Sequence, residues 1–90
     1  MGIAAIKIKL MPSSPDVNLE EIKAKAKAVV EKGDGKNCSF EEQPIAFSLK
    51  AIIVFFALDE SKPLEPIEEN LRKIKNVNSA EVVDMRRAFG

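Results

Sequence analysis

Few residues in this 90-residue chain could do chemistry. There is one cysteine, Cys38, and no histidine, which excludes histidine-based acid–base catalysis and a metal site built from cysteine and histidine. Glu41 and Glu42 are adjacent, and in a strand their side chains would point to opposite faces, so they do not form a catalytic carboxylate pair. Cys38 would be a reactive thiol only if something lowered its pKa, and it is interpreted as a small apolar filler.

Phe47 and the adjacent Arg86 and Arg87 are the remaining candidates for a functional role. On residue type alone, a phenylalanine that opens an apolar strand is more often part of the core. Arginines near a C-terminus are more often solvated charges. The residues by themselves therefore leave both roles open.

Composition limits the class of protein. The chain is 46% hydrophobic and 31% charged, which is typical of one globular domain spanning residues 1–90. Fourteen basic residues balance fourteen acidic ones, and this argues against direct nucleic-acid binding, which needs a basic surface. The longest apolar run, 51–58, is far shorter than the ~20 residues of a membrane helix. We expect a cytoplasmic protein without disulfides and without contact to a membrane.

The hydrophobic pattern predicts four strands and two helices. Residues 46–58 end in eight consecutive apolar residues, which favours a central strand covered on both faces. One helix should begin at Asn18 and end at Gly33, and the other should begin near Leu64. The four strands are expected at 3–10, 36–43, 46–58 and 80–87.

This order of elements, β-α-β followed by β-α-β, predicts an α+β fold of the ferredoxin-like split β-α-β type. The sheet should be antiparallel with strand order 4-1-3-2, and both helices should cover one face. The other face of the central strand would remain open. In the last strand we expect strict alternation, with 80, 82, 84 and 86 on one face and 81, 83, 85 and 87 on the other.

Five segments resemble the archaeal elongation factor 1-beta family, in the right order and over essentially the whole chain. They are 9–12 (Lys-Leu-Met-Pro), 14–19 (Ser-Pro-Asp-Val-Asn-Leu), 42–47 (Glu-Gln-Pro-Ile-Ala-Phe), 79–82 (Ser-Ala-Glu-Val) and 84–87 (Asp-Met-Arg-Arg). The resemblance implies a guanine-nucleotide exchange factor for the GTPase elongation factor 1-alpha. Such a factor makes and breaks no covalent bond, and we expect no cofactor and no resident metal.

The resemblance also implies the site residues. A basic residue at the end of the last strand enters the Mg²⁺ and phosphate region of the partner in related factors, and this position matches Arg87, with Arg86 beside it. A cation there competes with Mg²⁺ and loosens GDP. The aromatic residue that docks on the partner matches Phe47. In the family a glycine usually follows it, and this chain has Ser48.

The predicted topology adds a constraint of its own. Strands of about ten residues at ~3.3 Å per residue place Phe47 and Arg87 roughly 25–35 Å apart, at opposite ends of the sheet. One small-molecule pocket cannot use both, whereas a large protein partner can. The mechanism further expects an Arg87 guanidinium that is not held in an internal ion pair.

Other functions fit the same fold. A small-ligand regulatory module could dimerise through the open sheet face, and the oligomeric state is left open. An RNA-binding sheet would need more basic residues beside its aromatic ones than Lys50 alone. A phosphatase would need an arginine in the loop 11–16, which has none.

Overall fold

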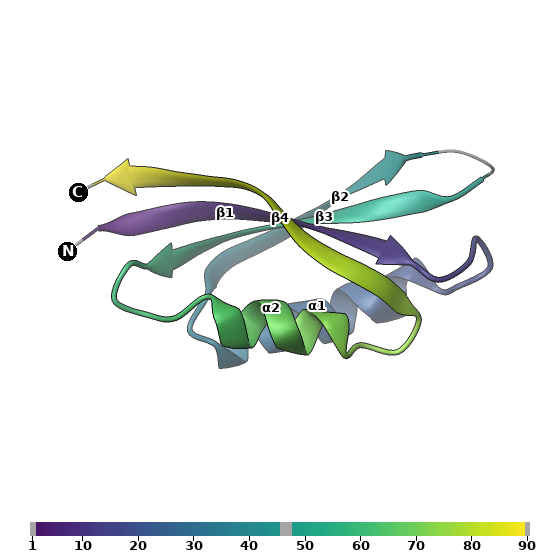
Figure 1. Cartoon of the computed structure of the whole chain (residues 1–90), viewed down its shortest axis with the longest axis horizontal. Coiled ribbons are helices and arrows are strands. Elements are labelled where there is room, and N and C mark those ends of the chain that lie inside the picture. The colour runs from purple at the N-terminus through teal and green to yellow at the C-terminus, as the bar shows by residue number, and fades with distance from the viewer. Residues whose placement is uncertain (1, 46–47, 90) are drawn as a thin grey trace.

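The computed structural model describes residues 2–45 and 48–89. Two layers are visible in Figure 1, a four-stranded sheet and a pair of helices that cover one of its faces. The elements in chain order are β1 (Ile3–Pro12), α1 (Leu19–Lys32), β2 (Lys36–Pro44), β3 (Lys50–Asp59), α2 (Glu65–Arg72) and β4 (Val77–Phe89).

The sheet has the strand order β2-β3-β1-β4, and every neighbouring pair is antiparallel. This confirms the predicted order 4-1-3-2, read from the other edge, and the ferredoxin-like α+β fold. The order follows from the connections, because each helix carries the chain past one strand position that the other half of the chain then fills. Strand β1 therefore lies between β3 and β4.

Alternation along β1 and β3 creates the core. In the β1–β3 register Ile6 lies opposite Phe56 and Ile8 opposite Val54, and all four side chains point toward the helices and are buried. Burying such a side chain stabilises the fold by about 1.5–3 kcal/mol. The helices complete the core with Ile22, Ala26 and Val30 from α1 and Ile67 and Leu71 from α2.

Local signals set the ends of α1 as predicted. The Asn18 Oδ1 atom accepts hydrogen bonds from the backbone N–H groups of Glu20 and Glu21, at 3.0 and 3.2 Å, which satisfies two donors at the helix start. The helix ends at Gly33. A Cβ atom at Gly33 would collide with the Ile67 side chain, so glycine also allows α2 to pack closely against the end of α1.

Four predicted strand boundaries were wrong by two residues or more. The central strand β3 begins at Lys50 rather than at residue 46. Strand β1 runs on to Pro12, which pairs with Val77, so β4 starts at Val77 rather than at residue 80, and it ends at Phe89 rather than at residue 87. A proline is tolerated at a strand end, where its missing N–H interrupts no further ladder bond.

The strict alternation predicted for β4 was also wrong, because a β-bulge interrupts it. Lys7 of β1 pairs with Asp84 and the next residue, Ile8, pairs with Val82, so Val83 has no partner in the β1–β4 register. Without this extra residue Asp84 would follow Val82 on the core face and bury an unpaired carboxylate, which is costly. The bulge turns Asp84 outward and brings Met85 to the helix side.

Candidate functional site

The bulge decides where Arg87 lies. Arg87 pairs with Ala4 near the start of β1, and Ala4 faces the helices. Together with Met85 and Leu64, Arg87 lines a 290 Å³ cavity at this end of the sheet. Its side chain is 69% exposed. Arg87 is therefore a surface cation at one end of the molecule, on the helix side of the last strand.

Arg87 is held in an internal ion pair, which contradicts the expectation of an unpaired guanidinium. Its Nε atom donates to Oε2 of Glu60 at 2.6 Å. The pairing arises because the turn after β3 lies beside the first residues of β1, and Arg87 lies on the other side of them. An ion pair this exposed contributes only about 0–1 kcal/mol to the stability of the fold. The anionic groups of a partner can therefore also bind the guanidinium.

Arg86 lies on the opposite face of the sheet from Arg87. Its Nε atom is 3.1 Å from Oδ2 of Asp84, and its side chain is 80% exposed. Asp84, Arg86, Lys7 and Phe55 line a second cavity on the open face. The two adjacent arginines therefore cannot reach the same point on a partner without rearrangement of the strand.

A structured turn holds Glu60 in place. The Glu60 backbone N–H donates to the Gly2 carbonyl oxygen at 2.9 Å, and the Asp59 carboxylate accepts from the Ser61 N–H at 2.8 Å and from the Ser61 hydroxyl at 2.7 Å. These bonds, led by the one from the Ser61 backbone N–H, lower the pKa of Asp59 below its ordinary value of 3.8. The turn is thus fixed when Asp59 is ionised.

We expect the Asp59→Asn variant to lose less stability in acid than the parent chain. A carboxylate whose pKa is lowered by folding stabilises the fold at pH values above its unfolded pKa, and this contribution disappears as the pH falls through the folded pKa. Thermal melts from pH 6 to pH 2.5 would measure it. Parallel declines of the two melting temperatures over the whole range would contradict the role of Asp59.

At the other end of the sheet lies Ser48. Phe47, the predicted aromatic anchor, falls outside the described residues, but Ser48 lines a 210 Å³ cavity together with Pro12 and Lys50. Pro12 and Ala4 are eight residues apart along β1, which corresponds to ~27 Å, and the molecule is 42 Å long. Ser48 and Arg87 therefore lie at opposite ends of the molecule, and the separation predicted for Phe47 and Arg87 stays a prediction.

Ser48 has a φ of 65°, in the left-handed region that glycine adopts most readily. A non-glycine residue there costs on the order of 1 kcal/mol. We expect the Ser48→Gly variant to gain up to about 1 kcal/mol of unfolding free energy, since the relief of strain exceeds the added freedom of the unfolded chain. Ser13→Gly, at a position without a positive φ, is the matched control and should not be stabilised. Thermal unfolding would measure both, and a lower melting temperature for Ser48→Gly would refute the interpretation.

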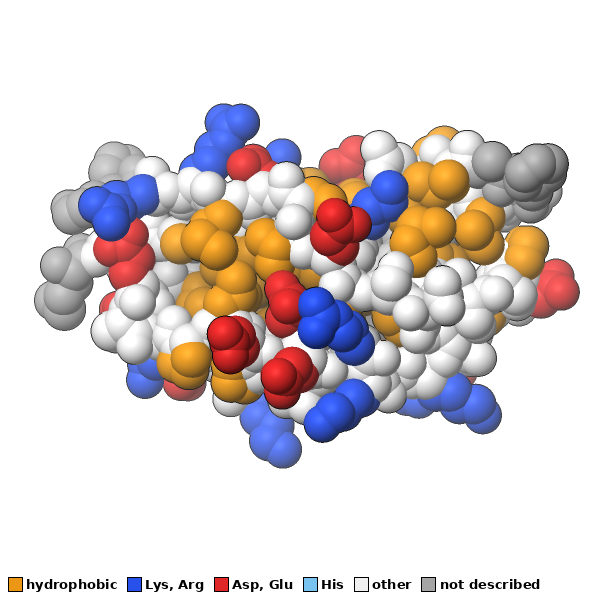
Figure 2. All heavy atoms as spheres, in the orientation of Figure 1, with side chains coloured by type: hydrophobic (Ala, Val, Ile, Leu, Met, Phe, Trp, Pro, Cys, Tyr) orange, Lys and Arg blue, Asp and Glu red, His pale blue; other side chains and the backbone are white. Residues whose placement is uncertain are grey.

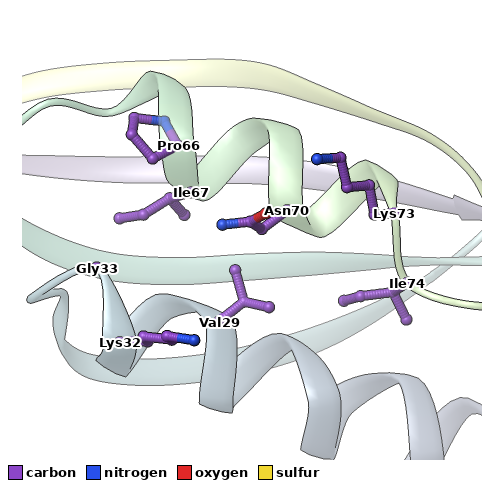
Figure 3. A pocket seen from close by; sticks show the side chains of 8 residues that line it. All are labelled: Val29, Lys32, Gly33, Pro66, Ile67, Asn70, Lys73 and Ile74. Atoms are coloured by element: carbon purple, nitrogen blue, oxygen red, sulfur yellow. The ribbon is translucent and has the colours of Figure 1, made fainter.

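A cavity of 460 Å³ lies between the two helices and is lined by no carboxylate. Figure 3 shows its eight lining residues, which come from α1, α2 and the residues just after them. Lys32, Asn70 and Lys73 are its polar members, and its lining residues include no carboxylate, hydroxyl or thiol. A hydrolytic or transfer reaction has no acid–base pair here.

Cys38 is half-buried and packs against the core. Burial raises the pKa of its thiol, with a further contribution from Glu31, and this keeps the sulfur in its unreactive form. Within residues 2–45 and 48–89, no group of three or more acidic or cysteine side chains could hold a metal ion. Over the same residues, no helix has the length and hydropathy to cross a membrane.

The open sheet face is only partly apolar. Phe55 and Ile53 are half-buried there, and the Lys7 Nζ atom lies 5.2 Å from the centre of the Phe55 ring, in the range of a cation–π contact. Figure 2, in the side-on orientation of Figure 1, shows apolar side chains in two areas with charged ones between them. The helices cover only the other face of the sheet, and Lys7 and Asp84 add charged side chains to the open one.

The chain resembles known proteins over nearly its whole length. Residues 5–88 match the family described as the EF-1 guanine nucleotide exchange domain. Elongation factor 1-beta of Methanosarcina barkeri is 44% identical over 88 residues, covering 97% of this chain and 99% of the relative. Elongation factor 1-beta of Methanocaldococcus jannaschii is 40% identical, covering 98% of this chain and 100% of the relative. Elongation factor 1-beta of Methanococcus maripaludis strain C7 is 38% identical, covering 94% of this chain and 97% of the relative.

Proposed function

Because the chain belongs to the family of EF-1 guanine nucleotide exchange domains, its role is nucleotide exchange in translation elongation, and we propose how it acts. The partner is the GTPase elongation factor 1-alpha, from which the chain releases GDP so that GTP can load. The observation that carries this function is the family match across residues 5–88. Residues 1–90 form a single exchange domain that works in the cytoplasm, where elongation takes place.

Arg87 displaces the Mg²⁺ ion of the partner. The guanidinium is 69% exposed at the end of β4, so it can enter a cleft of another protein without unfolding its own strand. Bound Mg²⁺ is the dominant charge in a nucleotide site and bridges the phosphate oxygens. A cation that occupies the same oxygens removes that bridge and loosens GDP. Phosphate oxygens match the planar fork of the guanidinium, which makes this contact favourable.

A second contact holds the partner at the far end of the molecule. Phe47 docks there as an aromatic anchor, and Ser48, which is exposed beside it, belongs to the same contact. The ~27 Å along β1 between Pro12, beside Ser48, and Ala4, beside Arg87, suits a GTPase that contacts the chain at two points. Anchoring at one end supplies affinity while the arginine at the other end acts on the nucleotide site.

Arg87 carries the displacement because it is the residue that matches the family position, and Arg86 lies on the opposite face of the sheet. Arg86 points to the open face and pairs with Asp84 on its own strand. Its contribution is to the charge of the surface that meets the partner. No covalent step is involved, so neither a catalytic acid or base nor a cofactor is required.

Release of a fluorescent GDP analogue from purified elongation factor 1-alpha tests the function. We expect the chain to accelerate release in proportion to its concentration until the GTPase is saturated. Raising the Mg²⁺ concentration should slow the stimulated release, because the metal and Arg87 compete for the same oxygens. No acceleration at any concentration would reject the function, and an acceleration insensitive to Mg²⁺ would reject the displacement mechanism alone.

A further inference from the structure

Glu60 is the residue that determines how Arg87 is presented. Its carboxylate accepts the hydrogen bond from the Nε atom of Arg87 at 2.6 Å. Within residues 2–45 and 48–89, neither Nη atom of Arg87 donates a hydrogen bond, so these two nitrogens keep their donors for another molecule. Glu60 thus binds the Nε side of the guanidinium and leaves the Nη side available to a partner.

The position of Glu60 is itself fixed by the first residues of the chain. Its N–H donates to the Gly2 carbonyl oxygen at 2.9 Å, and a Cβ atom at Gly2 would collide with the Glu60 carboxylate. Its side chain is only 33% exposed, against 69% for Arg87. The carboxylate is therefore the more constrained partner, and it restricts a side chain that would otherwise sample many rotamers in solvent.

We propose that Glu60 is a positioning residue for nucleotide exchange, which pre-orients the Arg87 guanidinium toward the phosphate and Mg²⁺ site of the GTPase. This inference rests on the proposed role of Arg87. An arginine that is ordered before binding loses less conformational freedom when it enters the partner, so more of its contact energy is available to displace the metal.

The alternative is that the same ion pair inhibits exchange by restraining Arg87. The positioning role and the inhibitory role make opposite predictions for removal of the Glu60 carboxylate. If Glu60 restrained Arg87 from leaving, removal of the carboxylate would speed exchange. If Glu60 orients Arg87, removal slows exchange, and a side chain that keeps only the hydrogen-bond acceptor preserves it. Glutamine at position 60 retains an oxygen for the Nε–H donor while it removes the charge.

The test measures stimulated GDP release by the Glu60→Ala and Glu60→Gln variants of the full chain. We expect Glu60→Ala to lower the maximal rate about threefold to tenfold, the range for loss of one pre-ordered side chain, with little change in the half-saturating concentration. Glu60→Gln should stay within about twofold of the parent chain, since it keeps the acceptor. Glu69→Ala, which removes an exposed carboxylate from α2, is the matched control and should have no effect.

A double variant separates positioning from general damage to the fold. In a chain that already carries Arg87→Ala, the added Glu60→Ala should cause no further loss, because its effect passes through the arginine. An additional loss in the double variant, or a faster rate with Glu60→Ala alone, would overturn the inference. A parent chain that fails to release GDP would instead reject the proposed function, so the two failures are distinguishable.

Discussion

The Arg87→Ala variant should lose nearly all of its ability to release GDP from elongation factor 1-alpha, by roughly thirtyfold or more. Truncating one side of a charged contact that is desolvated in a complex costs about 2 kcal/mol or more, and each 1.4 kcal/mol is a factor of ten. The loss should appear in the maximal rate, because the arginine acts on the nucleotide site. Stopped-flow release of labelled GDP at saturating exchange factor is the measurement.

Two variants serve as controls for this result. Arg86→Ala removes the neighbouring cation from the opposite face and should lower the maximal rate far less. Arg87→Lys keeps the charge but replaces the planar fork with a compact ammonium, and it should retain part of the activity. Thermal melts should show that all three variants fold, since the Arg87 side chain is exposed and its ion pair weak.

The outcome for Arg86 decides between the two arginines. A large loss with Arg86→Ala and none with Arg87→Ala would transfer the displacement role to the open face of the sheet. Such a result would also remove the basis for the positioning role of Glu60. An equal, modest loss in both variants would indicate that the pair contributes only surface charge.

The Leu71→Ala variant should lose about 3–5 kcal/mol of unfolding free energy, the upper part of the range for a buried leucine. Leu71 is fully buried and lies in α2, a helix of eight residues that is too short to be stable without tertiary packing. The total free energy of unfolding of a small domain is about 5–15 kcal/mol. The melting temperature should therefore fall by about 12 °C or more.

Glu69→Ala is the control for this helix. Its side chain lies two residues before Leu71 on the exposed surface, and surface substitutions of this kind change stability by about 0.5 kcal/mol or less. Urea titrations of both variants would provide the free energies. A loss below 1 kcal/mol in Leu71→Ala would mean that α2 contributes little to the core, contrary to its burial.

The sequence correctly predicted the elements whose hydrophobic pattern is regular. Apolar and polar residues alternate along most of β1, and the buried half of β3 is continuously apolar. α1 has both an apolar stripe and the Asn18 cap. Local patterning of this kind is set by the period of each element. The element order then restricts the connections, and the strand order follows from their handedness. The family resemblance supplied the function, which no residue pattern in the chain could supply alone.

The boundaries and the bulge were missed for a different reason. β4 begins at Val77 because β1 continues to Pro12 and offers it a partner, and a strand's length depends on its neighbour. The bulge at Val83 does have a weak signal in the sequence, since apolar residues stand at 80 and 82 and then at 83 and 85, so that the alternation changes phase between Val82 and Val83. A change of phase within one strand is what an inserted residue produces.

The amino-acid sequence by itself determined the fold, because periodicity and turn signals are local properties of the chain, and the resemblance of its segments to a known family pointed to Arg87. Only the tertiary structure decided which face carries Arg87 and that Glu60, 27 residues earlier, is its partner. Both depend on how three strands and a turn come together at one end of the sheet. Contacts between segments so far apart are set by packing, which no local pattern encodes.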